Sequence, residues 1–269
     1  FHAGNFADCM KHALLLRLLA AAQRKPGGLL LLDTHAGVGR YDLTEGPAER
    51  TGEWRGGIGR LLDSSGQAAS PGALAEYVAL IQRLGLYPGS PAILRALLRP
   101  QDRLVCCELH ALDHAALRRE FGHSKQVAIH RRDAWEALGA LLPAPERRAL
   151  VLIDPPYEAP DEFDRVAAGL RLALKRQPNA IIAAWYPIKH RAPVRAFHIA
   201  LRESGLRDLI AAELWLRPPL DAARLNGCGL LIANPPYGFE AEAAPILGAL
   251  AARLGEEGRG FAVERVADE

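Results

Sequence analysis

The sequence predicts an α/β fold built on a mostly parallel sheet. Residues 149–153 are five consecutive apolar residues, which is typical of a strand buried on both faces. Residues 29–32 form a similar leucine run before Asp33, and stretches with helical leucine and alanine spacing alternate with such runs. The chain has 269 residues, 49% of them apolar and 24% charged, which is enough for one large domain with an ample core.

Seven strands and several helices are expected. The strands are predicted at 29–33, 104–107, 127–130, 149–153, 180–185, 209–216 and 229–233. The last two flank a polar loop, which predicts a terminal hairpin whose last strand runs antiparallel to the others. Between the strands, helices are predicted at 13–23, 112–121 and 161–175.

The first strand leads into a glycine turn, Asp33-Thr34-His35-Ala36-Gly37-Val38-Gly39-Arg40. An acidic residue followed by Gly-x-Gly is typical of nucleotide binding in a Rossmann-like fold, because glycine lets the backbone approach the ligand. The third glycine of the dinucleotide pattern would fall at Asp42, which disfavours an NAD-dependent dehydrogenase.

The next strand begins more than sixty residues after Gly39, where a simple Rossmann unit would place its ribose-binding acid after about 20 residues. We therefore expect residues from about 42 to 100 to form a small inserted helical subdomain within a single domain of residues 1–269. Its helical patterns lie at 58–62, 74–84 and 93–98. The rigid turn Tyr87-Pro88-Gly89-Ser90-Pro91 between them could return to a cofactor pocket.

The strand at 149–153 stops at Asp154-Pro155-Pro156-Tyr157. Asp154 thus ends a buried strand, where open α/β sheets bind their ligands. An aromatic amine becomes more nucleophilic when a carboxylate and a proline-fixed carbonyl accept hydrogen bonds from its two hydrogens. Tyr157 offers a flat face on which a flipped-out base can stack. The motif resembles that of amino-directed, S-adenosylmethionine-dependent methyltransferases. The plainer interpretation is a strand followed by a proline-rich turn.

A second motif, Asn234-Pro235-Pro236-Tyr237, follows the predicted antiparallel strand. The carboxyl end of that strand points away from the ligand side of a parallel sheet. Asn234 is therefore interpreted as a turn residue.

Other polar residues at strand ends allow two interpretations each. Glu108 could accept both ribose hydroxyls or cap the following helix, and Asp133 could accept from an adenine amino group or cap a helix. Lys189, with His190 and Arg191, could meet RNA phosphates or begin a solvated helix. The polar residues of the opening segment could likewise be a solvated, capped helix start.

Net charge and cysteines restrict the classes further. A net charge of +2 does not by itself imply nucleic-acid binding, so an RNA partner would need a local patch. The four cysteines lack C-x-x-C spacing, which favours buried thiols in a cytoplasmic protein without a metal site. No apolar run reaches the ~18 residues that span a bilayer, and no signal peptide is apparent.

Three segments together strongly resemble the RlmJ family, bacterial large-subunit ribosomal RNA adenine-N6 methyltransferases. They are the opening Phe1-His2-Ala3-Gly4-Asn5-Phe6-Ala7-Asp8-Cys9-Met10-Lys11-His12, the glycine turn through Tyr41, and Asp154-Pro155-Pro156-Tyr157. The Tyr87 turn, Trp185-Tyr186-Pro187 and Asn234-Pro235-Pro236 extend the match over nearly the whole chain.

The resemblance implies a class I methyltransferase fold and S-adenosylmethionine as cofactor. It also implies 23S ribosomal RNA as substrate, at the adenine of position 2030, with a monomer acting before ribosome assembly is complete. The implied cofactor pocket consists of Lys11, His12, His35, Gly37, Ser90, Glu108, Asp133, Ala134 and Asp154. Asp154 is the expected catalytic residue, and the expected substrate contacts are Pro155, Tyr157 and Lys189.

Two features of the opening differ from the family pattern. The sequence begins at Phe1, so we expect the natural start to lie upstream, with a tyrosine that touches RNA. The family often has histidine where this chain has Phe6, so no role is assigned to that position.

Rival functions remain at this stage. DNA adenine or a protein glutamine amide would also fit an Asp-Pro-Pro-Tyr pocket, although the family-like opening argues against both. A non-catalytic nucleotide- or RNA-binding module is a further alternative. The acids Glu108, Asp133 and Asp154 at three strand ends speak against it, since a decayed enzyme would be free to lose them.

Overall fold

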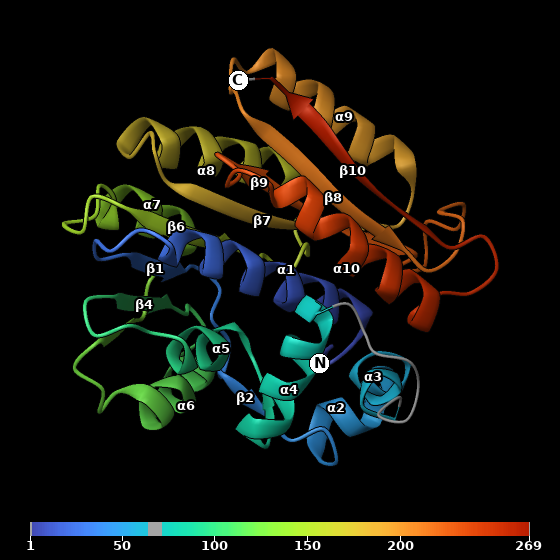
Figure 1. Ribbon diagram of the computed structural model, residues 1–269, viewed down its shortest axis with the longest axis horizontal. Helices are drawn as coiled ribbons and strands as arrows, with labels where there is room; N and C mark the ends of the chain where they lie inside the picture. Colours follow the sequence, from blue (N-terminus) through green and yellow to red (C-terminus); the bar gives the residue numbers. More distant parts are fainter. Residues whose placement is uncertain (1, 64–71, 269) are drawn as a thin grey trace.

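An eight-stranded mixed sheet forms the centre of the protein (Figure 1). The computed structural model describes residues 2–63 and 72–268. The strand order is β10-β8-β9-β7-β6-β1-β4-β5. Five strands are parallel: β1 (Leu30–Asp33), β4 (Arg103–Cys107), β5 (Val127–His130), β6 (Ala149–Ile153) and β7 (Ile181–Ile188).

The remaining strands form an antiparallel extension of the sheet. β9 (Gly227–Ala233) runs antiparallel to both β7 and β8 (Leu209–Trp215), which confirms the terminal hairpin. The predicted number of seven strands was wrong, because β10 (Gly260–Ala267) adds an eighth beside β8. β10 is a half-exposed edge strand, so it lacks the continuous apolar run that marks the others.

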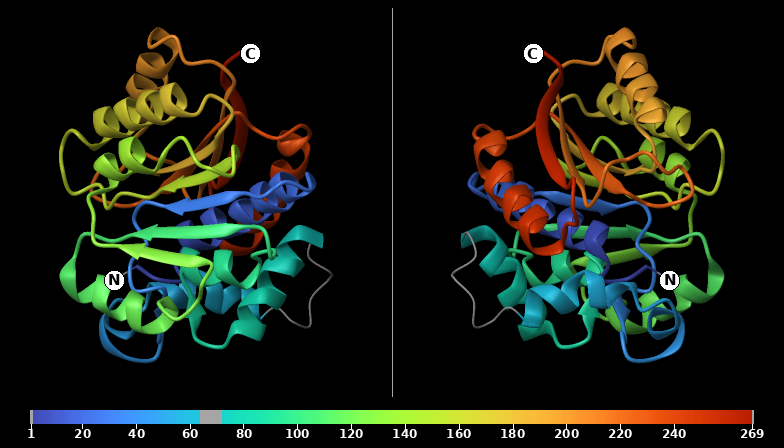
Figure 2. Two further views of the ribbon diagram at one scale, coloured as in Figure 1. Left: turned by 90° about the vertical axis from the view of Figure 1, so that its left-hand side faces the viewer. Right: turned by 90° about the vertical axis from the view of Figure 1, so that its right-hand side faces the viewer.

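Helices cover both faces of the sheet (Figures 1 and 2). On one face lie α1 (Phe6–Gln23), α6 (Ala111–Phe121) and α10 (Phe239–Leu254); on the other lie α7 (Ala134–Leu141), α8 (Glu162–Arg176) and α9 (Arg191–Glu203). Successive strand residues point to opposite faces, so Leu31 packs in the first core while Leu30 and Leu32 pack in the second. Burial of both faces explains why the central strands are apolar throughout.

The first helix starts earlier than predicted. α1 begins at Phe6 rather than at residue 13, because Asn5 caps it by accepting hydrogen bonds from the amides of Ala7 and Asp8, both at 3.0 Å. The interpretation of the opening as a capped helix start is thus confirmed in part, since Lys11 and His12 are buried rather than solvated.

The chain between β1 and β4 is largely helical. It contains β2 (Arg40–Tyr41), α2 (Gly46–Thr51), a 3₁₀ turn (Glu53–Gly56), α3 (Ile58–Asp63), α4 (Gly72–Leu84), β3 (Tyr87–Pro88) and α5 (Ser90–Ala96). Residues 64–71 of the expected insertion lie outside the described residues. Ile58, Leu61 and Tyr77 pack in the same core as α1 and α10. We therefore propose that residues 42–100 are an insertion that shares the main core.

Candidate active site

A partly buried trio of charged side chains lies at the carboxyl end of the sheet, the end at which the five parallel strands finish. The ammonium Nζ of Lys11 is 2.5 Å from Oδ2 of Asp154 and 2.7 Å from Oδ1 of Asp8. Asp154 follows β6, whereas the other two come from the first turns of α1. The two carboxylates and one ammonium sum to a charge of −1 when all three are ionised, which suits a cationic ligand.

Burial and pairing set the protonation of this trio. Burial raises the pKa of Asp154 above its ordinary value, and the Lys11 ammonium opposes that rise only in part. Burial acts the same way on Asp8, but there the charges of Lys11 and His12 and the hydrogen bonds outweigh it and lower the pKa to about 2. Burial alone would lower the pKa of Lys11, but the two carboxylates raise it. Lys11 therefore stays charged between them.

A further acid, Asp33, lies beside the trio. It ends β1, which is the neighbour of β6 in the sheet, and it is fully buried. Burial raises the pKa of Asp33 to about 6, with the Ser90 hydroxyl lowering it and Asp154 raising it. Neither Asp8 nor Asp33 was predicted as a site residue. The sequence signals were the polar opening and the acid before the glycine turn.

The glycine turn is held to the end of β4 by Glu108. One carboxylate oxygen of Glu108 accepts from the Gly37 amide at 2.8 Å, and the other accepts from the His110 amide at 2.7 Å. Gly39 has a φ of 84°, and a Cβ there would lie 2.4 Å from the Phe121 ring. Glu108 does not cap α6 with its side chain, since His110 is the residue at that cap position. Its ribose contact stays a prediction.

His35 connects the turn to Asp154. The Asp154 amide donates to Nδ1 of His35 at 3.3 Å, and the imidazole packs edge-on against Trp135 at 5.8 Å. Burial lowers the pKa of His35 to about 4, so the ring is neutral near pH 7. The structure thus brings His35, Lys11 and Asp154 together, and their contact with the cofactor stays a prediction.

Asp133 caps a helix. Its Oδ1 accepts from the amides of Trp135 (2.8 Å) and Glu136 (3.2 Å) at the start of α7, where Ala134 is buried. The capping interpretation is therefore confirmed, and the adenine contact stays a prediction. Beside it, Trp135 and Arg165 line a hollow of 500 Å³ between α7 and α8.

His12 and Ser90 lie deeper in the protein. Nδ1 of His12 is 3.2 Å from the Tyr87 hydroxyl, which is itself 3.2 Å from the hydroxyl of Tyr77. Burial lowers the pKa of His12 to about 3. Ser90 is buried in the first turn of α5, after Gly89, whose amide donates to the Gly39 carbonyl at 2.9 Å. The Tyr87 turn therefore does return to the glycine turn.

Tyr157 is fixed against an aromatic cluster. Its φ of 53° is in the left-handed region, and its hydroxyl donates to the Trp185 carbonyl at 3.0 Å. The ring packs edge-on against Phe163 at 5.0 Å and against Trp185 at 5.7 Å. Pro155, between Asp154 and this ring, is buried. The positions of Pro155 and Tyr157 are thus defined, and their contacts with a base stay predictions.

The basic residues after β7 separate into two groups. Lys189 and His190 are exposed, and His190 caps α9 by accepting from the Ala192 amide at 3.1 Å. Arg191 instead pairs with the buried Glu213 at 2.5 Å and lies 4.3 Å above the Trp215 ring. The helix-start interpretation is confirmed for His190, and an RNA contact by Lys189 stays a prediction.

Asn234 lies at the opposite, amino end of the sheet. β9 runs antiparallel to β7, so Ala233 pairs with Ile182 at the beginning of β7. The Asn234 side-chain amide donates to the carbonyls of Pro178 (2.8 Å) and Ala180 (2.7 Å). Asn234 is therefore a turn residue far from Asp154, as predicted.

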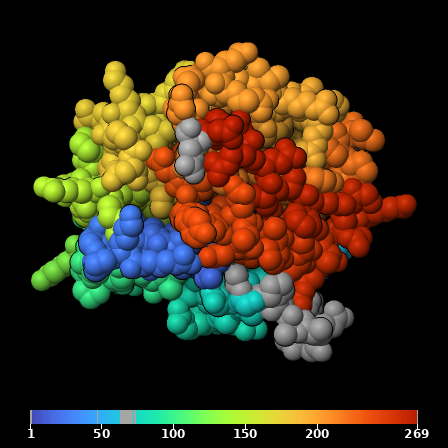
Figure 3. Space-filling view, turned by 45° about the horizontal axis from the view of Figure 1, so that its top comes forward, coloured from blue at the N-terminus to red at the C-terminus, as the bar shows by residue number. Residues whose placement is uncertain are grey.

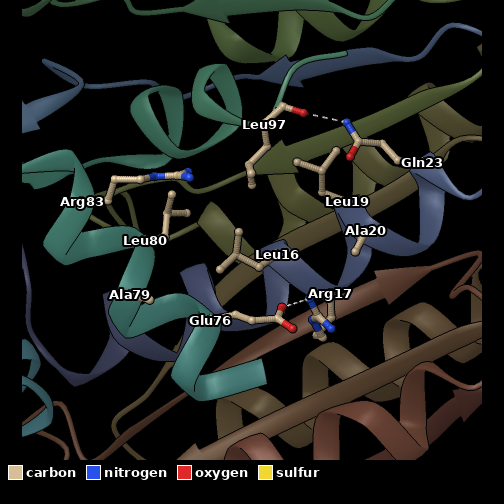
Figure 4. Close-up of a pocket in the computed structure, with 10 residues that line it drawn as sticks. All are labelled: Leu16, Arg17, Leu19, Ala20, Gln23, Glu76, Ala79, Leu80, Arg83 and Leu97. Atoms are coloured by element: carbon tan, nitrogen blue, oxygen red, sulfur yellow. Dashed lines mark hydrogen bonds and ion pairs between the residues drawn. The ribbon is translucent and has the colours of Figure 1, made fainter. Parts of the chain in front are cut away.

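A separate groove lies away from these residues. It has a volume of 390 Å³ and separates α1 from α4 (Figure 4). Arg17 and Glu76 form an ion pair of 2.5 Å across it, and Gln23 donates to the Leu97 carbonyl at 2.8 Å. None of the predicted site residues lines it.

Metal clusters and membrane-spanning helices are both absent from the described residues. Within 2–63 and 72–268, no cluster of three or more His, Cys, Asp or Glu side chains is arranged to hold a metal ion. In the same ranges, no helix is long and apolar enough to span a bilayer. All four cysteines are free and buried, as predicted.

Comparisons with known proteins agree on one family. The family model described as "Ribosomal RNA large subunit methyltransferase D, RlmJ" matches residues 26–266. A protein of Haemophilus influenzae named "Ribosomal RNA large subunit methyltransferase J" is 39% identical, over 100% of this chain and 98% of its own length. The Escherichia coli protein of the same name is 37% identical, over 97% and 95% of the two chains.

A solved structure has the same fold over nearly the whole chain. A crystal structure of a Legionella pneumophila protein superimposes with a TM-score of 0.90 at 34% identity and covers 98% of both chains. The family model begins at residue 26 and does not include the opening segment. The match of that segment to the family therefore depends on the full-length alignment with the Haemophilus protein. This chain belongs to the RlmJ family of ribosomal RNA large subunit methyltransferases.

Proposed function

We propose that this protein transfers a methyl group from S-adenosylmethionine to N6 of a single adenine in 23S ribosomal RNA. The observation that carries the proposal is the contact of Lys11 with Asp154 at the carboxyl end of β6, within the Asp-Pro-Pro-Tyr turn. Family membership supports the choice of ribosomal RNA over DNA and protein. The target adenine of position 2030 rests on the family resemblance.

Asp154 has the central role in this mechanism. Lys11 contacts Oδ2, which leaves Oδ1 of Asp154 for the N6 amine of a flipped base, with the Pro155 carbonyl as a second acceptor. Holding both amine hydrogens aligns the nitrogen lone pair with the methyl group, and such orientation supplies most of the acceleration. Lys11 counters the effect of burial and so favours the ionised carboxylate that this role needs. The proton leaves after transfer, so a strong base is not required.

The residues around the trio fit the cofactor. S-adenosylmethionine supplies, when bound, an electrophilic methyl group on a sulfonium. Glu108, held by the Gly37 amide, would accept from ribose hydroxyls, because each of its carboxylate oxygens has a further lone pair. The net charge of Asp8, Lys11 and Asp154 complements a cation. Lys11, His12, His35, Ser90, Asp133 and Ala134 complete the proposed pocket.

The base and its RNA strand would lie beside the aromatic cluster. Tyr157 offers its ring to the flipped adenine, and unstacking that base costs a few kcal/mol. The exposed Lys189 would meet a phosphate of the same strand. We further propose that the protein acts as a monomer in the cytoplasm, on RNA that is not yet fully assembled into ribosomes.

Transfer of labelled methyl groups tests the proposal. Wild-type protein, Asp154→Ala and the matched control Asn234→Ala are incubated with 23S transcripts, DNA and protein extract, and labelled RNA is mapped by nuclease digestion. We expect N6-methyladenine in one RNA fragment with the wild type and the control only. Label in DNA or protein with unlabelled RNA would overturn the substrate, and cofactor binding without any transfer would indicate a binding module.

A further inference from the structure

Tyr237 presents a whole aromatic ring to solvent at the amino end of the sheet. It is 99% exposed, whereas most aromatic rings bury much of their large apolar surface. It belongs to the turn that follows β9, on the side of the sheet opposite Asp154. An exposed flat ring is a face on which a base can stack.

The turn that carries Tyr237 is rigid. Asn234 is fixed by its two hydrogen bonds to the carbonyls of residues 178 and 180, and the next two residues are prolines. After the ring, the Phe239 amide donates to the Pro236 carbonyl at 3.0 Å, and the Phe239 side chain is buried. Because the backbone on both sides is held, ordering this ring against a ligand costs little entropy.

The ring borders a hollow of 470 Å³ that is lined by cations and by no acid. Arg24 and Lys25, which directly follow α1, and Arg148, which directly precedes β6, supply these cations. Figure 3 shows α1 (blue) beside the segment that opens α10 (orange-red) on this surface. Arg24 pairs with Glu242 at 2.8 Å, and Arg148 donates to the carbonyls of Gly27 and Ala22. Lys25 forms no ion pair with any described residue, so its charge is available.

We propose that this hollow is a second RNA site, which binds a single-stranded segment of the substrate RNA. A base stacks on Tyr237, and a neighbouring phosphate lies against Lys25. The pairing of an exposed aromatic face with unopposed positive charge is the combination that binds single-stranded nucleic acid without sequence preference. This inference rests on the proposed function, since the RNA that reaches the hollow is the one methylated at Asp154.

The two sites are close enough for one RNA molecule. Lys11 and Lys25 lie near opposite ends of α1, and fourteen residues at 1.5 Å per residue separate them by about 20 Å. A short hairpin at the Asp154 site would not reach around the sheet, whereas a longer fragment with single-stranded flanks would. The hollow would therefore add affinity for long RNA only.

The test compares the dissociation constants of two RNAs: a short hairpin with the target adenine, and a long 23S fragment that contains it. We expect Tyr237→Ala to weaken binding of the long fragment by at least about fivefold and Tyr237→Phe to bind as the wild type, because phenylalanine keeps the stacking face. Lys25→Gln should reduce the salt dependence for the long fragment by about one phosphate contact. The matched control Lys175→Gln, an exposed lysine on α8, should change neither quantity.

Three results would overturn the inference: unchanged binding of long RNA by Tyr237→Ala, equal losses in Tyr237→Ala and Tyr237→Phe, or equal losses for both RNAs. The failure of the proposed function is a separate result, because methyl transfer by the wild-type protein is measured on the same two RNAs. If the wild type methylates neither RNA while Tyr237→Ala still loses affinity for the long one, the second site stands and the catalytic proposal falls.

Discussion

Two proline-rich turns with nearly the same amino-acid sequence have opposite surroundings in this molecule. Asp154-Pro155-Pro156-Tyr157 and Asn234-Pro235-Pro236-Tyr237 each follow a buried strand, and each has one residue in the left-handed region, Tyr157 with a φ of 53° and Asn234 with a φ of 51°. β6 runs parallel to its neighbours, whereas β9 runs antiparallel to β7. The direction of the strand therefore determines the end of the sheet at which each turn lies, and so the residues that surround it.

The turn at the carboxyl end of the sheet is in contact with a charged side chain. Asp154 contacts Lys11, and the Tyr157 ring is held half-buried within an aromatic cluster. At the amino end, Asn234 meets two backbone carbonyls, and Tyr237 faces solvent. The comparison teaches that the direction of the strand, and not the motif alone, decides whether an Asn/Asp-Pro-Pro-Tyr turn lies at the end of the sheet where we propose the active site.

The largest expected effect is on transfer by Asp154→Asn. The amide removes the negative charge and one strong acceptor at the reacting amine. We expect kcat to fall by about 10²–10³-fold, as for other losses of one electrostatic contact in an active site. Steady-state kinetics on a 23S transcript measure it, with the circular-dichroism spectrum and the urea unfolding midpoint as checks on folding. A loss of less than threefold would remove Asp154 from the reaction.

A smaller effect is expected from Lys11→Met. Without the ammonium, nothing opposes the effect of burial, so the pKa of Asp154 rises further above its ordinary value. Because the ionised carboxylate is the active form, activity is lost as pH falls, and the rising limb of the pH–rate profile should move to higher pH. We expect roughly a tenfold loss of kcat at pH 7, which recovers in part at higher pH. An unshifted profile would contradict this role.

Asp8→Asn should reduce stability. Asp8 has a folded-state pKa of about 2 against an ordinary value of 3.8, so it contributes stability above pH 4 that is lost as pH falls toward 2. This depression corresponds to roughly 2 kcal/mol of unfolding free energy at neutral pH. Urea unfolding of the wild type and the variant at pH 7 and at pH 3 measures it. The difference in unfolding free energy between the wild type and the variant must be smaller at pH 3 than at pH 7.

The smallest effect is expected from Asn234→Ala. The substitution removes two hydrogen bonds to backbone carbonyls, one of them at an exposed position, and should cost about 1 kcal/mol of unfolding free energy. Because Asn234 lies at the amino end of the sheet, kcat on a short RNA should stay at the wild-type value. A large fall in kcat with unchanged stability would mean that this turn takes part in the reaction.

The sequence predicted most of the sheet, because central strands buried on both faces carry continuous apolar runs. It did not predict β10, since Glu264 and Arg265 interrupt the apolar pattern of this half-exposed edge strand. The true start of α1 was missed because the polar residues Lys11 and His12 are buried and the polar Asp8 is half-buried. Hydrophobic periodicity therefore stops seven residues short of the helix start at Phe6.

Only part of the candidate site was predicted from the sequence, for a related reason. The Asp154 turn was found because its neighbours in sequence define it. Its pairing with Lys11 spans 143 positions and follows only from the packing of α1 against the sheet. Asp8 was visible as a polar residue of the opening, but its bond to Lys11 required the helix to begin at Phe6.

The most direct test exchanges the two residues in one molecule, as Asp154→Asn together with Asn234→Asp. The measurement is kcat for methyl transfer to a short RNA hairpin that contains the target adenine, beside the wild type and each single variant. The account predicts that kcat falls by about 10²–10³-fold in both the double variant and Asp154→Asn, while Asn234→Asp keeps the wild-type kcat. Transfer by the double variant at a rate well above that of Asp154→Asn would show that the turn at the amino end can carry the reaction, and would contradict the assignment of catalysis to the carboxyl end of β6.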